Sequence, residues 1–266
     1  MKPKHIASLF FVILLFSVVA ASNGNGNRVR VIAHTDQEVS DALSRDCKVV
    51  REARTLKALV CEENVASSLG LQEDIRFFAM DSGANAQINA TGVHVAGNTG
   101  TGRKVVILDT GYNYNHSELN SSYLGGKDFV NDDNDSFDDN GHGSHVAGLI
   151  TADGIKSTAK GVAPETGIIA GKVLDYRGSG FFTDIIAGVY WAVDGPDGIS
   201  GTADDFNADA ISMSLGTSLP YVYKSFCDSV LPDMTNAIKY ARDRGVTVVV
   251  AGGNSGSSGV SIPGCI

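Results

Sequence analysis

The sequence predicts an α/β fold with a parallel, doubly wound sheet, preceded by a smaller α+β domain. From about residue 104 onward, short apolar strands alternate with helical segments, as is typical of a parallel sheet covered on both faces. Between about residues 27 and 80, strands and short helices follow one another in a different order. The apolar fraction of 43% and the charged fraction of 19% are those of a globular protein, not of a disordered one.

The first residues have the pattern of a secretory leader. A basic start, Met1–His5, precedes a nearly continuous apolar run, Ile6–Val19, and Ala20–Ser22 supplies the small residues of a cleavage site. The apolar run is shorter than the ~20 residues that a membrane span needs. We therefore expect residues 1–21 to be a signal peptide and the mature protein to be secreted, with no membrane association after its removal.

The charge balance argues against some classes of partner. The chain has 21 Lys and Arg against 30 Asp and Glu, which gives a formal net charge of −9. An acidic protein of this kind is repelled by nucleic acids and by anionic membrane surfaces, so neither is expected as a partner. Gly is abundant, with 31 residues, but it follows no three-residue period, and collagen is therefore excluded.

Residues 22–82 are predicted to form the smaller domain. Its expected elements are the strand Arg28–Ile32, a helix capped by Asp36 and running through Leu43, a hairpin of Cys47–Val50 with Leu56–Cys61, the helix Asn64–Leu69 and a last strand, Ile75–Phe78. The order βαββαβ is that of the ferredoxin-like, split βαβ arrangement. That arrangement supports many functions, so by itself it says little about activity.

The four cysteines fall into two neighbourhoods. Cys47 and Cys61 lie opposite each other in the expected hairpin, which is a geometry that a disulfide can bridge. Cys227 and Cys265 lie far downstream. Four cysteines allow three pairings, of which Cys47–Cys61 with Cys227–Cys265 is the simplest in an exported protein, and free thiols remain an alternative.

Residues 83–266 are predicted to form the larger domain, and its first residues belong to a Ser-, Gly-, Ala- and Asn-rich stretch, Asp81–Gly97, that is expected to be a linker or a processing segment. The expected strands and helices alternate in the order Lys104–Leu108, His142–Ala152, Ile168–Leu174, Thr183–Val193, Ala210–Met213, Met234–Arg244 and Val246–Ala251. Reactive residues in such sheets gather beyond the carboxyl ends of the strands. The loops that begin at Asp109, Asp175, Ser214 and Gly252 are therefore the candidate site.

Three polar residues stand out where a loop leaves a strand or opens a helix. Asp109 directly follows a strand, His142 opens a helix between two glycines, and Asn254 follows the last strand. A carboxylate near His142 would favour its protonation during a reaction. The amide of Asn254 could donate a hydrogen bond to a developing oxyanion. Taken singly, Asp109 and Asn254 are also ordinary turn residues.

Five segments together resemble the motifs of the subtilisin-like serine proteases, in the order of that family. They are Val105–Gly111, Asn140–Gly148 with the sequence NGHGSHVAG, Val173–Gly180, Ser212–Gly216 and Ala251–Gly256. Residues 22–82 also resemble the propeptide of the family. The resemblance implies a subtilisin-like peptidase domain over residues 83–266, with the protein's own propeptide as a folding assistant and intramolecular inhibitor.

The resemblance also implies a role for each matching residue. Asp109 would orient His142, which would take the proton from a serine nucleophile and return it to the leaving amine. Asn254 would donate to the oxyanion. A protein or peptide substrate would lie as an added strand between two edges of the cleft. These edges are Gly178, Ser179 and Gly180 on one side and Ser214, Leu215 and Gly216 on the other.

The nucleophile of the family is not found in its expected context. It lies in a Gly-Thr-Ser motif that opens a helix well beyond the oxyanion Asn. The triplet Gly216–Ser218 matches by letters, but it follows a substrate-edge strand and lacks the continuation of the motif. Ser214 and Ser255 have structural roles in the family. We therefore expect a C-terminally incomplete protease, with no peptidase activity from the 266-residue chain alone.

Six carboxylates crowd into the segment Asp128–Asp139. Such carboxylates repel one another, and a hard cation with oxygen ligands removes that cost, so a structural calcium ion is expected. Thermostable members of the resembled family bind calcium in a similar loop, and Asp128, Asp133 and Asp135 are the matching residues. The alternative is a solvated acidic loop. No organic cofactor is expected.

Two other functions are consistent with parts of the sequence. His142 and His145 share one helix face and could serve a zinc hydrolase, although His145 precedes apolar residues and is expected to pack or form hydrogen bonds within the core. A truncated, non-catalytic decoy or inhibitor that acts through residues 27–80 is the stronger alternative, because these residues resemble a protease-binding propeptide and the nucleophile is missing. We expect a monomer in each case.

Overall fold

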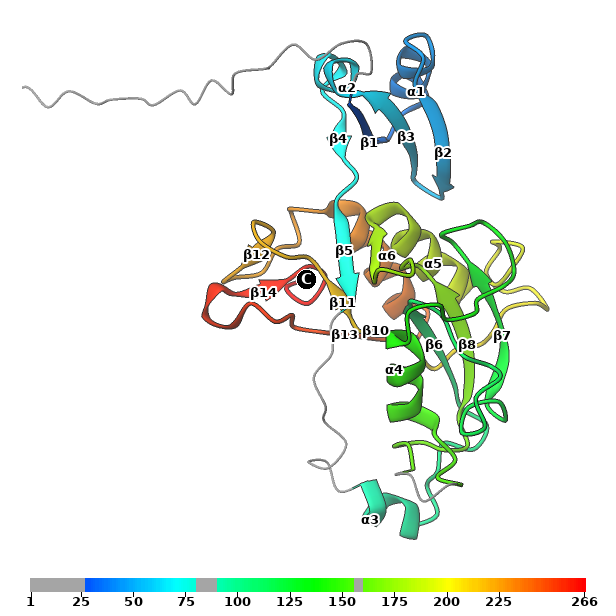
Figure 1. The fold of residues 1–266 in the computed structure, drawn as a ribbon. Helices are drawn as coiled ribbons and strands as arrows, with labels where there is room; N and C mark the ends of the chain where they lie inside the picture. The colour runs from blue at the N-terminus through cyan, green and yellow to red at the C-terminus, as the bar shows by residue number, and fades with distance from the viewer. Residues whose placement is uncertain (1–26, 80–89, 156–159) are drawn as a thin grey trace, which may run out of the picture.

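The structure is a computed structural model that describes residues 27–79, 90–155 and 160–266. The expected signal peptide, residues 1–21, lies outside the described residues. None of the helices in the described ranges is long and apolar enough to cross a membrane. The described chain forms a small N-terminal domain and a larger domain that follows it (Figure 1).

The N-terminal domain is an antiparallel sheet with two helices, as predicted. Its elements are β1 (Arg28–Ala33), α1 (Asp36–Leu43), β2 (Lys48–Ala53), β3 (Leu56–Glu62), α2 (Glu63–Leu69) and β4 (Gln72–Glu73). The strand order is β2-β3-β1-β4, with antiparallel pairing throughout. On one face of β1, Val31 and Ala33 pack with Ala42 and Leu59 in the domain's own core. On the other face, Ile32 belongs to the core of the larger domain.

The cap of α1 differs by one residue from the prediction. Thr35, not Asp36, precedes the first helical turn, and its hydroxyl accepts a hydrogen bond from Glu38 N at 3.2 Å. The Glu38 carboxylate in turn accepts one from Thr35 N at 2.9 Å. This reciprocal pair is a capping box, in which a Thr satisfies a free N–H of the first turn and the Glu satisfies the N–H of the capping residue.

The last predicted strand of the small domain belongs to a different sheet. The fourth strand of the N-terminal sheet is β4, whereas β5 (Arg76–Ala79) lies between β11 (Leu215–Gly216) and β9 (Ser179–Phe181) of the larger domain. Figure 1 shows β5 running from the small domain into the larger one beside β11. The chain changes partner at Asp74, which is buried and bonded to both domains. The assignment of Ile75–Phe78 to the small sheet is therefore wrong.

The larger domain is built on a five-stranded parallel sheet of order β13-β10-β6-β8-β7, which confirms the predicted α/β class. Its strands are β6 (Lys104–Asp109), β7 (Tyr123–Asp128), β8 (Gly167–Lys172), β10 (Ala210–Met213) and β13 (Thr247–Val250). Its helices are α3 (Ala90–Val95), α4 (His142–Thr151), α5 (Phe182–Asp194) and α6 (Pro232–Asp243). A short hairpin of β12 (Val222–Tyr223) with β14 (Val260–Ser261) and the 3₁₀ turn η2 (Gly256–Ser258) complete it.

Helix α3 and strand β7 are among the elements that the sequence analysis missed. Helix α3 lies within the stretch predicted to be a linker, and β7 forms an edge of the parallel sheet. Strand β7 has the sequence YLGGKD. Because it contains two glycines and a lysine, it lacks the run of apolar residues that would predict a buried strand. It forms because it pairs in parallel with β8, which is a contact distant in sequence.

The helices cover both faces of the parallel sheet. On β6, Val106 and Leu108 pack into the cluster that includes α5 and α6, whereas Ile107 packs with residues of α4. Successive side chains of a strand point to opposite faces, so a continuous apolar strand needs cover on both sides. This arrangement brings the carboxyl ends of β6, β8 and β10 to one edge, where α4 begins.

Both cysteine pairs are disulfides in the structure. A disulfide between Cys47, just before β2, and Cys61, near the end of β3, links the two strands of the hairpin away from its turn, with a Cα–Cα distance of 4.4 Å. Cys227 and Cys265, 38 residues apart, are joined at a Cα–Cα distance of 5.4 Å. No cysteine in the described residues is free.

Candidate active site

Asp109 and His142 meet at the carboxyl edge of the parallel sheet. His142 Nδ1 lies 2.7 Å from Asp109 Oδ1. Asp109 is the last residue of β6 and is fully buried, whereas the His142 side chain is 15% exposed. Burial raises the pKa of Asp109, and the hydrogen bond from His142 opposes that rise. The arrangement fixes the ring of His142 against a desolvated carboxylate.

The loop before α4 is organised by Asp138. One Asp138 oxygen accepts hydrogen bonds from Asn140 N and Gly141 N, and the other accepts from both Ser144 N and Ser144 Oγ, at 2.6 to 3.0 Å. Burial alone would raise the pKa of Asp138, but the hydrogen bonds from Gly141 and Ser144 outweigh it and lower the pKa. Asp138 therefore acts as an ionised cap at the helix start that carries His142.

Thr110 connects the Asp109 loop to the His142 helix. Its backbone N–H donates to Asp109 Oδ1 at 2.7 Å. Its hydroxyl donates to Asp138 Oδ1 and accepts from Gly143 N, each at 2.8 Å. At Gly143 a Cβ atom would lie 2.2 Å from Gly111 O, so only Gly permits this approach. The spacing of Asp109 and His142 is thus set by direct contacts between the two loops.

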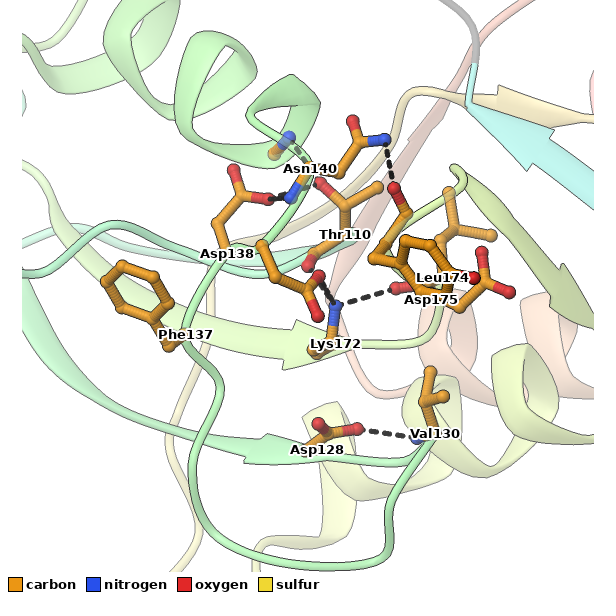
Figure 2. Close-up of polar contacts among 12 residues, drawn as sticks. Thr110, Asp128, Val130, Phe137, Asp138, Asn140, Lys172, Leu174 and Asp175 are labelled. Carbon is orange, nitrogen blue, oxygen red and sulfur yellow. Dashed lines mark hydrogen bonds and ion pairs between the residues drawn. The ribbon is translucent and has the colours of Figure 1, made fainter.

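Lys172 is a buried cation on the strand next to Asp109, and Figure 2 shows it near Thr110 and Leu174. It is the last residue of β8, is 2% exposed, and pairs in register with Asp109 on the neighbouring strand. Its Nζ donates to Thr110 O at 2.7 Å, to Leu174 O at 3.1 Å and to Asp139 Oδ1 at 2.6 Å. One ammonium group therefore contacts the Asp109 loop, the His142 loop and the segment that leads to β9.

The sequence analysis missed Thr110, Asp138, Ser144 and Lys172. A signal was present for two of them. Asp138 stands four residues before the first residue of a helix, where a carboxylate can cap free N–H groups. Lys172 is a charged residue inside an otherwise apolar strand, and such a residue is buried only with a partner.

The two strands expected to bind substrate enclose a strand of the chain itself. β5 lies antiparallel to both β9 and β11, with Phe77 opposite Gly180 and Ala79 opposite Leu215. Gly178 precedes β9 in the left-handed conformation, with φ of 74°, and its N–H donates to Asp175 O. Ser214 lies between β10 and β11. An extended peptide is therefore held between the two predicted edges through backbone pairing.

Asn254 lies in the loop that follows β13. Strand β13 neighbours β10, which in turn neighbours β6, so this loop leaves the sheet at the same edge as Asp109. The Asn254 residue is exposed. The triplet Gly216–Ser218, in contrast, runs from β11 into a turn and opens no helix. The Thr217 hydroxyl contacts the carbonyl of Tyr221, as expected of a structural residue.

The acidic loop does not bring its carboxylates together around one point. Asp128 accepts hydrogen bonds from Val130 N, Asn131 N and Asn131 Nδ2. Asp133 accepts one from Asp135 N, and Asp135 bonds to Tyr114 and Phe137. Within the described ranges, no group of three or more His, Cys, Asp or Glu side chains could hold a metal ion. Because calcium also takes backbone carbonyl ligands, its binding here stays a prediction from the sequence, as does the zinc alternative.

Comparison of the sequence with known protein families identifies the family of this chain. Residues 100–266, more than half of the chain, match the subtilase family, peptidase family S8. The chain belongs to the subtilase family. The match covers the strand that ends in Asp109, the helix that begins at His142 and the loop of Asn254.

Individual subtilases are similar over different shares of the chain. Thermophilic serine proteinase from Bacillus sp. (strain AK1) is 38% identical over 59% of this chain and 34% of its own length. Thermitase from Thermoactinomyces vulgaris is 35% identical over 62% of this chain and 52% of its own. The chain thus spans a third to a half of these relatives. Subtilisin J from Geobacillus stearothermophilus is 35% identical over 98% of this chain and 70% of its own length, so that alignment includes the N-terminal domain.

Proposed function

We propose that this subtilase is a secreted serine endopeptidase that hydrolyses peptide bonds in protein substrates. Family membership supports the class of reaction. The observation that carries the proposal is the 2.7 Å contact of His142 with Asp109, in a domain whose strands β9 and β11 hold an extended strand between them. The leader pattern of residues 1–21 supports export.

In the proposed mechanism, Asp109 holds the ring of His142 through Nδ1, which leaves Nε2 to take the proton of a serine hydroxyl. The buried carboxylate stabilises the imidazolium that forms, and His142 then returns the proton to the leaving amine. Asn254 would donate to the oxyanion, and loss of such a donor costs about 10²–10³ in kcat, a magnitude measured in a subtilisin. The peptide substrate would pair with β9 and β11 as an added strand, in the place that β5 takes here.

The N-terminal domain would act as an intramolecular inhibitor. Its continuation, β5, is paired between β9 and β11, and its sheet packs on α5 and α6 of the larger domain. A substrate cannot add a strand where β5 is already paired. Removal of the N-terminal domain is therefore proposed to precede activity.

The 266 residues supply Asp109, His142 and Asn254 but no serine in the expected Gly-Thr-Ser context that opens a helix. We propose that this chain alone does not hydrolyse peptides. The test treats two samples with a serine-reactive fluorophosphonate probe: the purified 266-residue chain and the protein secreted by its native host. The gene is sequenced past codon 266 in parallel.

We expect labelling of the native protein, loss of labelling in its His142→Ala variant, and no labelling of the 266-residue chain. Labelling of the 266-residue chain would show that a serine within it reacts, which contradicts the proposed inactivity. If the native protein is not labelled and its reading frame stops after Ile266, the endopeptidase proposal fails. The alternative, an inhibitor that binds other subtilases through its N-terminal domain, would then be tested by titrating a subtilisin with the chain.

A further inference from the structure

Lys172 joins the three loops that surround the Asp109–His142 pair. An ammonium group has three N–H donors, and Lys172 directs them to the carbonyls of Thr110 and Leu174 and to the carboxylate of Asp139. The side chain is almost fully buried, at 2% exposed, whereas the Asp139 side chain is 48% exposed. A cation in this position is tolerated because each of its donors has an acceptor.

Two of the three residues that Lys172 binds are connected directly to the loops of Asp109 and His142. Thr110, whose carbonyl it binds, donates its own N–H to Asp109 Oδ1. Asp139, whose carboxylate it binds, is followed by the turn of Asn140 and Gly141 that ends at His142. The two contacts therefore tie the loop that carries Asp109 to the loop that carries His142 through one charged group (Figure 2).

The third contact reaches the substrate-binding edge. Leu174, whose carbonyl Lys172 binds, precedes Asp175, and Asp175 accepts hydrogen bonds from Gly178 N and Ser179 N at the start of β9. The position of β9 relative to the pair thus depends on the same group.

We propose that Lys172 is a positioning residue for the Asp109–His142 pair and for strand β9. It contacts neither substrate nor the reacting atoms, and it acts by fixing the separation of the three loops. Removing its ammonium leaves two carbonyls without their donor and frees the Asp139 carboxylate to turn toward water. The Asp109–His142 distance is then no longer held. The proposal rests on the assignment of this pair as the proton-transfer machinery.

The test uses a spectroscopic signature that does not need a nucleophile. A proton on His142 Nδ1 that is bonded to a carboxylate gives a strongly deshielded ¹H resonance, which can be recorded on the 266-residue chain. Lys172→Met keeps the unbranched stem and removes only the ammonium. We expect this variant to lose the resonance while the melting curve still shows one cooperative transition.

Lys104→Met is the matched control. Lys104 begins β6 at the opposite end of the strand from Asp109, and its Nζ donates to the carbonyl of Phe206 at 2.8 Å. This variant also loses a partly buried lysine in the same sheet, but not at the site. We expect it to keep the resonance, even if its melting temperature falls as far as that of Lys172→Met.

Variants of Asp139 keep the proposal testable if Lys172→Met does not fold. Asp139→Asn retains an oxygen acceptor for Lys172 and should keep the resonance, whereas Asp139→Ala removes the acceptor and should weaken or broaden it. A folded Lys172→Met with an unchanged resonance overturns the proposal. Equal loss of the resonance in Lys104→Met also overturns it, because the effect would then be one of general stability. Absence of the resonance in the unmodified chain would instead refute the Asp109–His142 pair, and with it the proposed mechanism.

Discussion

Asp74 of the N-terminal domain caps the amino end of helix α5 in the larger domain through Thr183. Its two carboxylate oxygens accept hydrogen bonds from Thr183 N at 3.2 Å and from Thr183 Oγ1 at 2.8 Å. Arg30 Nε donates to the same carboxylate at 2.7 Å, and Arg30 Nη2 also contacts Asp184 on α5. Asp74 is 2% exposed, so a titratable group lies buried where the two domains meet.

The stability of the docked chain is predicted to depend on pH through Asp74. Burial raises the pKa of Asp74 from 3.8 to about 6, against the opposing effect of Arg30 and Thr183. Because the pKa is higher in the folded state, the contribution of Asp74 is complete below about pH 4, falls as the pH rises to about 6, and is constant above that. The loss corresponds to about 3 kcal/mol. Urea unfolding of the chain between pH 4 and 7.5 measures it.

Asp74→Asn isolates this contribution from those of other carboxylates. The difference in unfolding free energy between the unmodified chain and the variant should shrink or reverse as the pH rises from 4 to 6.5, because Asn has no charge to bury. Asp46→Asn is the control, since the Asp46 side chain is 84% exposed. A difference between Asp74→Asn and the unmodified chain that stays constant over this range would refute the prediction.

Arg30 is predicted to contribute far more to the docked state than Arg28, two residues earlier on the same strand. The Arg30 side chain is 17% exposed and pairs with Asp74 and Asp184, which are nearly buried, whereas Arg28 pairs with exposed Asp46. Removing one partner of a buried ion pair leaves an uncompensated charge and costs about 3–5 kcal/mol. An exposed pair contributes about 0–1 kcal/mol.

The two arginines are compared as Arg30→Met and Arg28→Met by urea unfolding at pH 7.5. We expect a large fall in the unfolding midpoint for Arg30→Met alone. Limited proteolysis should also cut the N-terminal domain of this variant faster, because the domain is less firmly docked. Similar midpoints for the two variants would show that the Arg30 contacts do not hold the domains together.

Calcium binding by the acidic loop stays a prediction from the sequence. The carboxylates of Asp128, Asp133 and Asp135 accept hydrogen bonds from the N–H groups of their own loop. If the loop binds calcium, adding Ca²⁺ to the metal-free chain should raise the melting temperature, and a chelator should lower it again. Asp135→Asn should abolish the rise. If the melting temperature does not change with Ca²⁺, the calcium prediction is wrong and the segment is a solvated acidic loop.

Most of the fold could be predicted because its signals are local. The apolar residues of β6 and the glycine-flanked start of α4 can each be recognised from a few neighbouring residues. Together they place Asp109 and His142 at one edge of the sheet. The sheet to which β5 belongs could not be predicted. The short run RFFA indicates a strand but not its partners, and β9 and β11 are about 100 and 140 residues further along the chain.

The supporting contacts of the site were unpredictable for the same reason. Lys172 and Thr110 are 62 residues apart, and no spacing in the sequence indicates that the ammonium of one meets the carbonyl of the other. Their meeting follows from the parallel register of β6 with β8, which places Lys172 beside Asp109. Register between distant strands is fixed by the packing of both sheet faces, which is a property of the whole domain.

Two glycines of helix α4 are predicted to respond in opposite directions to the same substitution. At Gly143 a Cβ would lie 2.2 Å from Gly111 O and 3.0 Å from Gly111 N, so the helix and the Asp109 loop must move apart. At Gly148, within the same helix, a Cβ meets no atom within 4 Å. Forcing a methyl group into a packed contact costs about 1–3 kcal/mol, whereas Gly→Ala in a helix interior stabilises by about 0.5–1 kcal/mol.

The melting temperature of Gly143→Ala should therefore fall and that of Gly148→Ala should rise. Because the contact at Gly143 sets how closely the start of α4 approaches Asp109, Gly143→Ala should also lose the deshielded His142 Nδ1 proton, which Gly148→Ala should retain. A Gly143→Ala variant that keeps both its melting temperature and this proton would mean that the two loops can separate without disturbing the pair. The close approach of Gly143 to Gly111 would then have no part in holding His142 against Asp109.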